Sequence, residues 1–190
     1  MNFTDKRYFL YRHLKDYKSI DKQEEESRLE TIKFIESNEN CFDRTCIPGH
    51  VTGSALVVNE DITEVLLNYH AKVKKWIQFG GHSDGENNPF NVALRETFEE
   101  SGLKEVKFIY PYTGIFLLDH HPIPAHNGEL DHIHYDVSII LMAKNSDKIN
   151  ISNESKDIKW VKIEDVEKYN SRDKMKKMIK KALAIKSTLI

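Results

Sequence analysis

The chain has 190 residues, of which 39% are hydrophobic and 31% are charged, so it can bury the core of one domain beneath a highly charged surface. The formal net charge of −2 argues against general electrostatic binding to nucleic acid. No apolar run approaches the ~20 residues that span a bilayer, and the charged start lacks the apolar segment of a signal peptide. With only Cys41 and Cys46, a disulfide scaffold is excluded, and we expect a soluble cytoplasmic protein without membrane attachment.

The first part of the chain is predicted to be helical. Hydrophobic residues at helical spacing predict helices over 3–18 and 20–37. Pro48 and the glycine after it mark a change to strand-like sequence, so we interpret residues 1–48 as a helical extension and residues 49–190 as the main domain. The two helices either pack on their own domain, cover a pocket or form the interface of a homodimer.

The rest of the chain reads as strands mixed with a few helices. Short segments rich in β-branched and aromatic residues predict strands over 51–58, 63–70, 74–79, 106–118, 132–143 and 157–163. A glycine-rich turn over 80–85 leads into a helix over 90–101, which Gly102 closes. Further helices are predicted over 164–169 and 172–188. This alternation predicts the α/β class, with a mixed sheet between layers of helices.

Three carboxylates of the central helix carry the strongest chemical signal. Glu96, Glu99 and Glu100 are spaced i, i+3 and i+4, which places all three on one face of a helix. Such close like charges repel one another unless a cation lies among them, and Mg²⁺ prefers oxygen ligands. Leu94 and Phe98 are expected to pack the opposite side of the helix against a sheet.

The glycines before this helix point to a ligand. Gly80, Gly81 and Gly85 permit a tight loop whose backbone approaches a bound molecule closely. The loop ends at a helix N-terminus, which favours phosphate oxygens.

The same stretch resembles the Nudix box, G-x5-E-x7-R-E-U-x-E-E-x-G-U, where U is a bulky aliphatic residue. The positions that match in register are Gly81, Arg95, Glu96, Glu99, Glu100, Gly102 and Leu103. Two positions depart from the pattern. Asn87 stands where the early glutamate belongs, with Glu86 one place before it, and Thr97 stands at the aliphatic position.

The resemblance, which is to a bacterial Nudix subgroup with a helical N-terminal extension, implies a fold and an activity. The fold is an α/β/α sandwich, and the activity is that of a pyrophosphohydrolase acting on acid anhydrides with Mg²⁺ (or Mn²⁺). The metal would be held by the three glutamates and by the Gly80 carbonyl, and one glutamate would act as general base. Arg95 is predicted to pair within the motif. Glu154 is a candidate late acid/base or metal ligand.

A histidine-rich stretch follows, with members at His120, His121, His126, His132 and His134. In a strand, His132, His134 and Asp136 share one face, where the histidines either contact substrate, bind a transition metal or form a plain polar face. No spacing among them matches a closed zinc site. His82 is a candidate substrate contact, with support of the glycine loop as the alternative, whereas His50 is expected to be structural. The HPIPAH segment is predicted to be a substrate-selecting loop.

These observations favour the hydrolysis of a phosphoanhydride bond in a small molecule, a nucleoside diphosphate linked to another moiety. One alternative is a non-catalytic nucleotide-binding sensor or adaptor, which the Asn87 departure would suit. Another is an isoprenoid diphosphate isomerase that uses Cys41 or Cys46 together with histidines.

Overall fold

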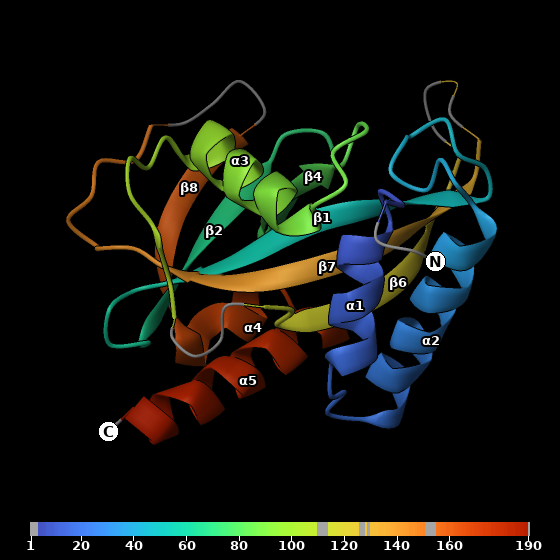
Figure 1. Cartoon of the computed structure of the whole chain (residues 1–190). Coiled ribbons are helices and arrows are strands. Elements are labelled where there is room, and N and C mark those ends of the chain that lie inside the picture. The colour runs from blue at the N-terminus through green and yellow to red at the C-terminus, as the bar shows by residue number, and fades with distance from the viewer. Residues whose placement is uncertain (1–3, 110–113, 126–127, 129, 151–154, 190) are drawn as a thin grey trace. The chain divides into compact units, whose positions relative to one another are not determined.

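The computed structural model describes residues 4–109, 114–125, 128, 130–150 and 155–189. The helices are α1 (Tyr8–Asp16), α2 (Lys22–Ser37), α3 (Pro89–Ser101), α4 (Val166–Tyr169) and α5 (Asp173–Leu189), with a 3₁₀ turn η1 (Ile163–Asp165) before α4. The strands are β1 (Gly49–Val58), β2 (Glu64–His70), β3 (Lys75–Ile77), β4 (Phe79–His82), β5 (Lys107–Phe108), β6 (Leu117–Ile123), β7 (His132–Met142) and β8 (Ser155–Lys162) (Figure 1). The chain forms two compact units, and β1, α3 and β7 each begin in the first unit and end in the second.

The strands form a mixed sheet with the order β3-β2-β1-β7-β5, in which β4 pairs with β1, β6 with β7 and β8 with β2. The pairs β1–β2, β2–β3, β2–β8, β5–β7 and β6–β7 are antiparallel. Strands β1 and β7 run in the same direction. The Ile133 amide donates to the Pro48 carbonyl where both strands begin, and the Ala143 amide donates to the Val58 carbonyl where both end, each at 2.9 Å. The sheet is therefore mixed, as predicted from the sequence.

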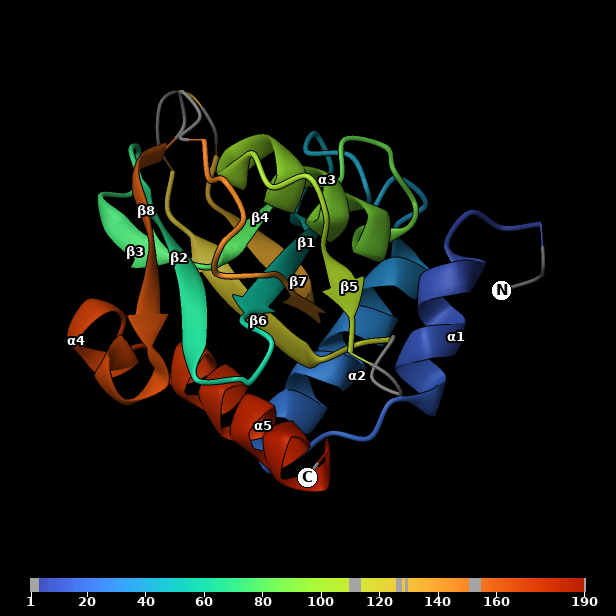
Figure 2. The same ribbon diagram turned by 90° about the vertical axis from the view of Figure 1, so that its left-hand side faces the viewer.

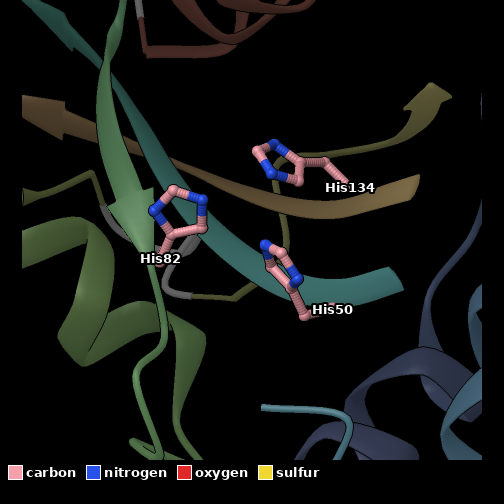
Figure 3. Close-up of side chains that lie close together, drawn as sticks. All are labelled: His50, His82 and His134. Carbon is pink, nitrogen blue, oxygen red and sulfur yellow. The ribbon is translucent and has the colours of Figure 1, made fainter. Parts of the chain in front are cut away.

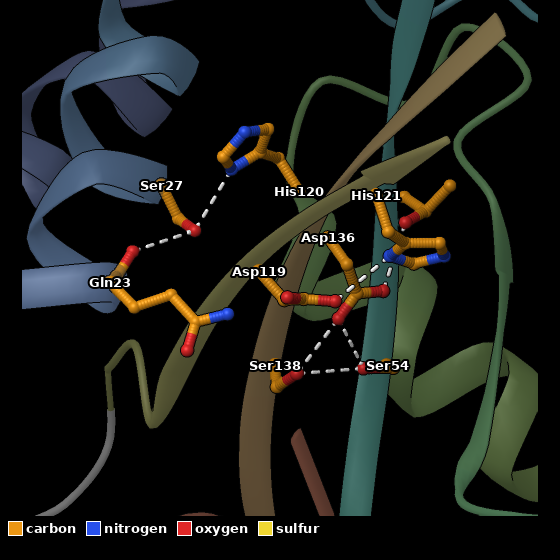
Figure 4. A network of polar contacts seen from close by, with 9 residues as sticks. Gln23, Ser27, Ser54, Asp119, His120, His121, Asp136 and Ser138 are labelled. Carbon is orange, nitrogen blue, oxygen red and sulfur yellow. Dashed lines mark hydrogen bonds and ion pairs between the residues drawn. The ribbon is translucent and has the colours of Figure 1, made fainter. Parts of the chain in front are cut away.

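The first unit joins the N-terminal helices to β6. Helix α2 begins after Asp21, whose side chain accepts the backbone N–H of Glu24 at 2.8 Å. The buried carboxylate of Glu24 accepts the hydroxyl of Tyr17 and, at 3.2 Å, the amide of Leu118. The Ser27 hydroxyl also lies 3.0 Å from Nδ1 of His120 (Figure 4). Helix α2 is thus held to β6 by a buried acid and not only by apolar contact.

The second unit surrounds β2. Residues Val65, Leu66 and Leu67 are consecutive in β2 and all fully buried, as expected of a strand that is covered on both faces. The C-terminal half of α3 lies on one side of the strands of this unit and α5 on the other (Figure 2). Helix α5 turns an apolar face inward, with Met175, Met178, Ala182 and Ile185 buried.

Two predicted elements have different bounds in the structure. The first helix begins at Tyr8, after turn and bend residues at 4–7, and ends at Asp16. The strand predicted over 74–79 is two strands, and β4 continues to His82, so the first residues of the predicted glycine turn belong to a strand. A Cβ added to Gly80 would lie 2.6 Å from the Cβ of Ser54. Glycine is needed there because β4 and β1 approach closely, and not because the chain turns.

The predicted strand over 106–118 is also divided, with β5 near its start and the beginning of β6 at its end. The HPIPAH segment over 121–126 was predicted to be a loop. Instead, its first three residues belong to β6, where His121, Pro122 and Ile123 face His134, Ile133 and His132 of β7. The loop prediction was based on the two prolines, but β6 pairs with β7 along this stretch and Pro122 is accommodated within the pairing.

Candidate functional site

Helix α3 begins at a local network of side chains. The Asn88 side chain accepts the backbone N–H of Phe90 at 3.0 Å, which caps the helix. The carboxylate of Glu86 accepts the backbone N–H of Asn88 at 2.9 Å. The glutamate that stands one place early in the box therefore braces the start of the helix through the backbone.

The three glutamates of α3 differ strongly in exposure. The side chain of Glu99 is 59% exposed and that of Glu96 13% exposed, whereas Glu100 is 3% exposed. The Arg95 guanidinium lies 2.8 Å from a carboxylate oxygen of Glu96 and 3.3 Å from one of Glu99. One cation thus offsets part of the negative charge that the three carboxylates bring together.

The buried Glu100 is held by a residue that the sequence analysis did not identify. Asn68 of β2 is fully buried, and its side-chain amide donates to Oε1 of Glu100 at 2.9 Å. Glu100 therefore reaches the interior of the second unit with a hydrogen-bond donor in place, as a buried carboxylate requires. The two residues are 32 positions apart, and no local sequence pattern indicates this contact.

The packing face of α3 is not the predicted one. Phe98 is exposed and Leu94 is half-buried, whereas Thr97, at the aliphatic position of the box, is fully buried. The helix buries Val92, Ala93, Thr97, Glu100 and Ser101. The prediction that Phe98 packs against the sheet was wrong, because it treated all three glutamates as one exposed face although Glu100 belongs to the buried one.

Three histidines from three strands of the first unit gather in one place (Figure 3). His50 lies on β1, His82 at the end of β4 and His134 on β7, and one nitrogen from each lies within 4.8 Å of the others. His132 is next to them, since its Nε2 is 3.2 Å from Nε2 of His134 and its ring stacks on His50 at 4.8 Å. The structure thus brings together His82, His132 and His134, which the sequence analysis named, and adds His50, which it had expected to be structural.

The surroundings keep two of these rings neutral. Burial, with smaller contributions from His82 and His132, lowers the pKa of His50 to about 4. Burial also lowers the pKa of His134 to about 2, with smaller contributions from His82 and His50. At neutral pH both rings therefore carry a lone pair on one nitrogen.

The histidines belong to a longer polar face between β1 and β7. His50, Thr52 and Ser54 alternate along β1. On β7, Asp136 is buried and accepts three hydroxyls, from Thr52 at 2.9 Å, from Ser54 at 2.6 Å and from Ser138 at 2.8 Å. Figure 4 shows the two serines beside this carboxylate. The alternation in both segments was the sequence signal that links His50 to His134.

The remaining predicted residues are divided between the two units or fall outside the described residues. Gly80 belongs to the first unit, in β4, whereas Glu96, Glu99 and Glu100 belong to the second. Glu154 and His126 lie outside the described residues. His121 is on β6, where its Nδ1 is 2.8 Å from the carboxylate of Asp119.

A mixed sheet flanked by helices, one of which carries a cluster of carboxylates, defines an α/β protein with an acidic helical motif. A family model described as the NUDIX domain matches residues 49–182, which is more than half of the chain. The chain therefore belongs to the NUDIX domain family.

Several solved structures share the fold. The Ap4A hydrolase of C. elegans in a binary complex superposes with a TM-score of 0.59 at 19% identity, covering 73% of this chain and 98% of that one. The dihydroneopterin triphosphate pyrophosphohydrolase of E. coli gives 0.54 at 13% identity, covering 70% and 95%. A Nudix hydrolase from M. smegmatis gives 0.53 at 17% identity, covering 74% and 88%. These similarities establish the α/β/α fold of the Nudix type that the sequence predicted.

A comparison with curated protein sequences finds no match. None of the helices in the described part of the chain has an apolar stretch of the length needed to cross a bilayer.

Proposed function

We propose that this protein is a divalent-metal-dependent pyrophosphohydrolase that cleaves a phosphoanhydride bond in a nucleoside diphosphate linked to another moiety. The observation that carries the proposal is the carboxylate cluster of α3, in register with the box, with one member buried and hydrogen-bonded. A solvated face of a surface helix does not require a buried glutamate with its own donor.

The donor set fits a hard divalent cation. Glu96, Glu99 and Glu100 supply only oxygen atoms, which Mg²⁺ and Mn²⁺ accept. We assign these three side chains as the metal ligands. When bound, such a cation neutralises phosphate charge and lowers the pKa of a coordinated water.

The chain's own residues have separate roles in this proposal. Arg95 pairs with Glu96 and Glu99, so it acts as a scaffold that keeps neighbouring carboxylates at close range. Asn68 fixes one oxygen of Glu100 and thereby orients the other. Glu99 is the most exposed of the three, which makes it the glutamate best placed to exchange protons with solvent. Most of the acceleration would come from positioning and from offsetting charge.

The similar structures support the substrate class in general terms. The C. elegans protein is named as a hydrolase of Ap4A, and the E. coli protein as a pyrophosphohydrolase of a triphosphate. Both names denote cleavage of compounds with linked phosphates. We extend this class of chemistry, and not either compound, to this chain.

The decisive experiment is product release from a panel of diphosphate compounds in Mg²⁺ or Mn²⁺. The panel includes ADP-ribose, nucleotide sugars, dinucleoside polyphosphates, NADH, coenzyme A and modified nucleoside triphosphates. Glu100→Gln and Glu99→Gln should each lower kcat/KM by more than about 100-fold, because even residues behind metal ligands contribute 10–100-fold. Glu105→Gln, an exposed glutamate outside α3, is the matched control and should retain activity.

Each outcome separates the alternatives. Wild-type turnover by Glu100→Gln would contradict the assignment. No turnover of any compound in the panel, with Mg²⁺ bound and the protein folded, would favour the nucleotide-binding sensor. The isomerase alternative is weakened by the burial of Cys41 and Cys46, which places both thiols away from solvent, and incubation with isopentenyl diphosphate tests it.

A further inference from the structure

The histidine cluster of the first unit has the composition of a transition-metal site. His50, His82 and His134 come from β1, β4 and β7, so three separate strands hold the rings. Figure 3 shows the rings gathered around a common centre. Imidazole nitrogen is a preferred ligand of Zn²⁺, Cu²⁺, Ni²⁺ and iron, whereas Mg²⁺ prefers oxygen.

An independent observation points to a missing ligand at this cluster. His50 is 2% exposed, and neither of its ring nitrogens has a hydrogen-bond partner among the residues that the structure describes. Buried polar atoms in folded proteins almost always have a partner, and each exception needs an explanation. A metal ion bound to one nitrogen of His50 would provide that partner.

The neighbouring hydrogen bonds prepare His134 for the same role. His132 Nδ1 lies 2.8 Å from the carbonyl of Leu130 and must donate to it, because a carbonyl only accepts. Nε2 of His132 lies 3.2 Å from Nε2 of His134, so the two rings are in hydrogen-bond contact. His132 is therefore a positioning residue that holds the ring of a ligand in place.

We propose that His50, His82 and His134 bind one Zn²⁺ ion through three neutral imidazoles, with a water molecule as the fourth ligand. Three histidines and a water are a recognised tetrahedral arrangement for zinc. Zinc–nitrogen bonds of about 2.0 Å place donor atoms roughly 3.3 Å apart, so the present separations of up to 4.8 Å must shorten by up to about 1.5 Å.

This site uses none of the carboxylates of α3 and does not depend on the proposed hydrolase activity. The two donor sets also select different ions, since oxygen ligands favour Mg²⁺ and imidazoles favour Zn²⁺. Zinc would occupy lone pairs of His82 and His134, so the metal replaces the direct contacts between these histidines and the substrate that the sequence analysis considered.

Equilibrium dialysis of the full chain against Zn²⁺, after removal of metal with a chelator, tests the proposal. The parent protein should bind about one Zn²⁺ per chain, and so should a Glu99→Gln/Glu100→Gln variant. The half-buried His82 is the safest ligand to replace, and His82→Gln should weaken binding by at least about 100-fold. His120→Gln is the matched control, because His120 bonds to Ser27 and not to the cluster, and it should bind like the parent.

A second measurement does not depend on any variant being folded. The parent protein loaded with Co²⁺ in place of Zn²⁺ should show the intense visible absorption of a tetrahedral site, and Zn²⁺ should abolish it. The proposal is wrong if the parent shows no such absorption. It is also wrong if His82→Gln, folded by circular dichroism, binds Zn²⁺ as tightly as the parent, or if the double glutamate variant alone loses it.

Discussion

Replacing Asn68 by leucine separates the positioning of Glu100 from the stability of the fold. The Asn68 amide donates to Oε1 of Glu100 at 2.9 Å, and both side chains are buried. Leucine has a similar volume and no polar atom, so the substitution removes this hydrogen bond without opening a cavity.

Two contributions to stability oppose each other in this variant. A hydrogen bond to a charged group contributes about 1.5–3 kcal/mol, and the variant loses it. Leucine also removes Oδ1 of Asn68, a buried oxygen that lacks a partner among the described residues and that costs about 1–3 kcal/mol. We therefore expect the free energy of unfolding to change by no more than about 2 kcal/mol.

Metal affinity has no such compensation. The carboxylate of Glu100 loses the donor that orients it, and the loss of an outer partner weakens metal binding about 10–100-fold. Calorimetric titration with Mg²⁺ measures this affinity, and urea unfolding measures the stability of the same preparation. Equal Mg²⁺ affinity in the variant and the parent would refute the positioning role. A large loss of stability with unchanged affinity would show that Asn68 is structural.

Two further predictions concern the stability of the first unit. Gly53→Ala adds a Cβ that would lie 2.3 Å from the carbonyl oxygen of Pro89. The free energy of unfolding should therefore fall by about 2–3 kcal/mol, and the thermal midpoint should fall by about 2–4 °C per kcal/mol lost. Gly114→Ala, whose Cβ would meet nothing within 4 Å, should not lower the midpoint, and equal effects of the two changes would contradict the close contact. Burial raises the pKa of Cys41 from 9.0 to about 12, so its contribution to stability is complete below pH 9.0 and is lost as the pH rises towards 12. Urea unfolding between about pH 8 and pH 10 should therefore show a steeper loss in the parent than in Cys41→Ala, and parallel losses would count against this thiol.

The features predicted best from the sequence are those that depend on interactions between residues close in the chain. The helix that carries Glu96, Glu99 and Glu100 was found with nearly correct bounds, because its side-chain spacing and the closing Gly102 are local signals. The left-handed φ of 68° at Gly102 is the conformation that closes a helix. The division of the residues between helix and strand was likewise mostly correct.

Long-range contacts account for what the sequence missed. Asn68 contacts Glu100 only because β2 packs beside α3 within the second unit, and a lone asparagine in a strand gives no hint of this. His50 was interpreted without reference to any other residue, because it precedes a strand predicted to begin at residue 51. In the structure its ring lies beside that of His134, since β1 and β7 run in parallel. The glycines of β4 were assigned to a turn because sequence alone does not distinguish a turn from a close approach of strands.

The buried carboxylate of Glu24 changes the meaning of the N-terminal extension. In the sequence, residues 1–48 precede the stretch that the family model recognises. In the molecule, Glu24 accepts the backbone amide of Leu118, and the ring of Phe34 stacks on Tyr135 at 4.0 Å. A protein truncated to begin at residue 49 would lack the acceptor of the Leu118 amide in β6 and the ring that stacks on Tyr135 in β7. What a family comparison treats as an appendage belongs, in this chain, to the same compact unit as β6 and the start of β7.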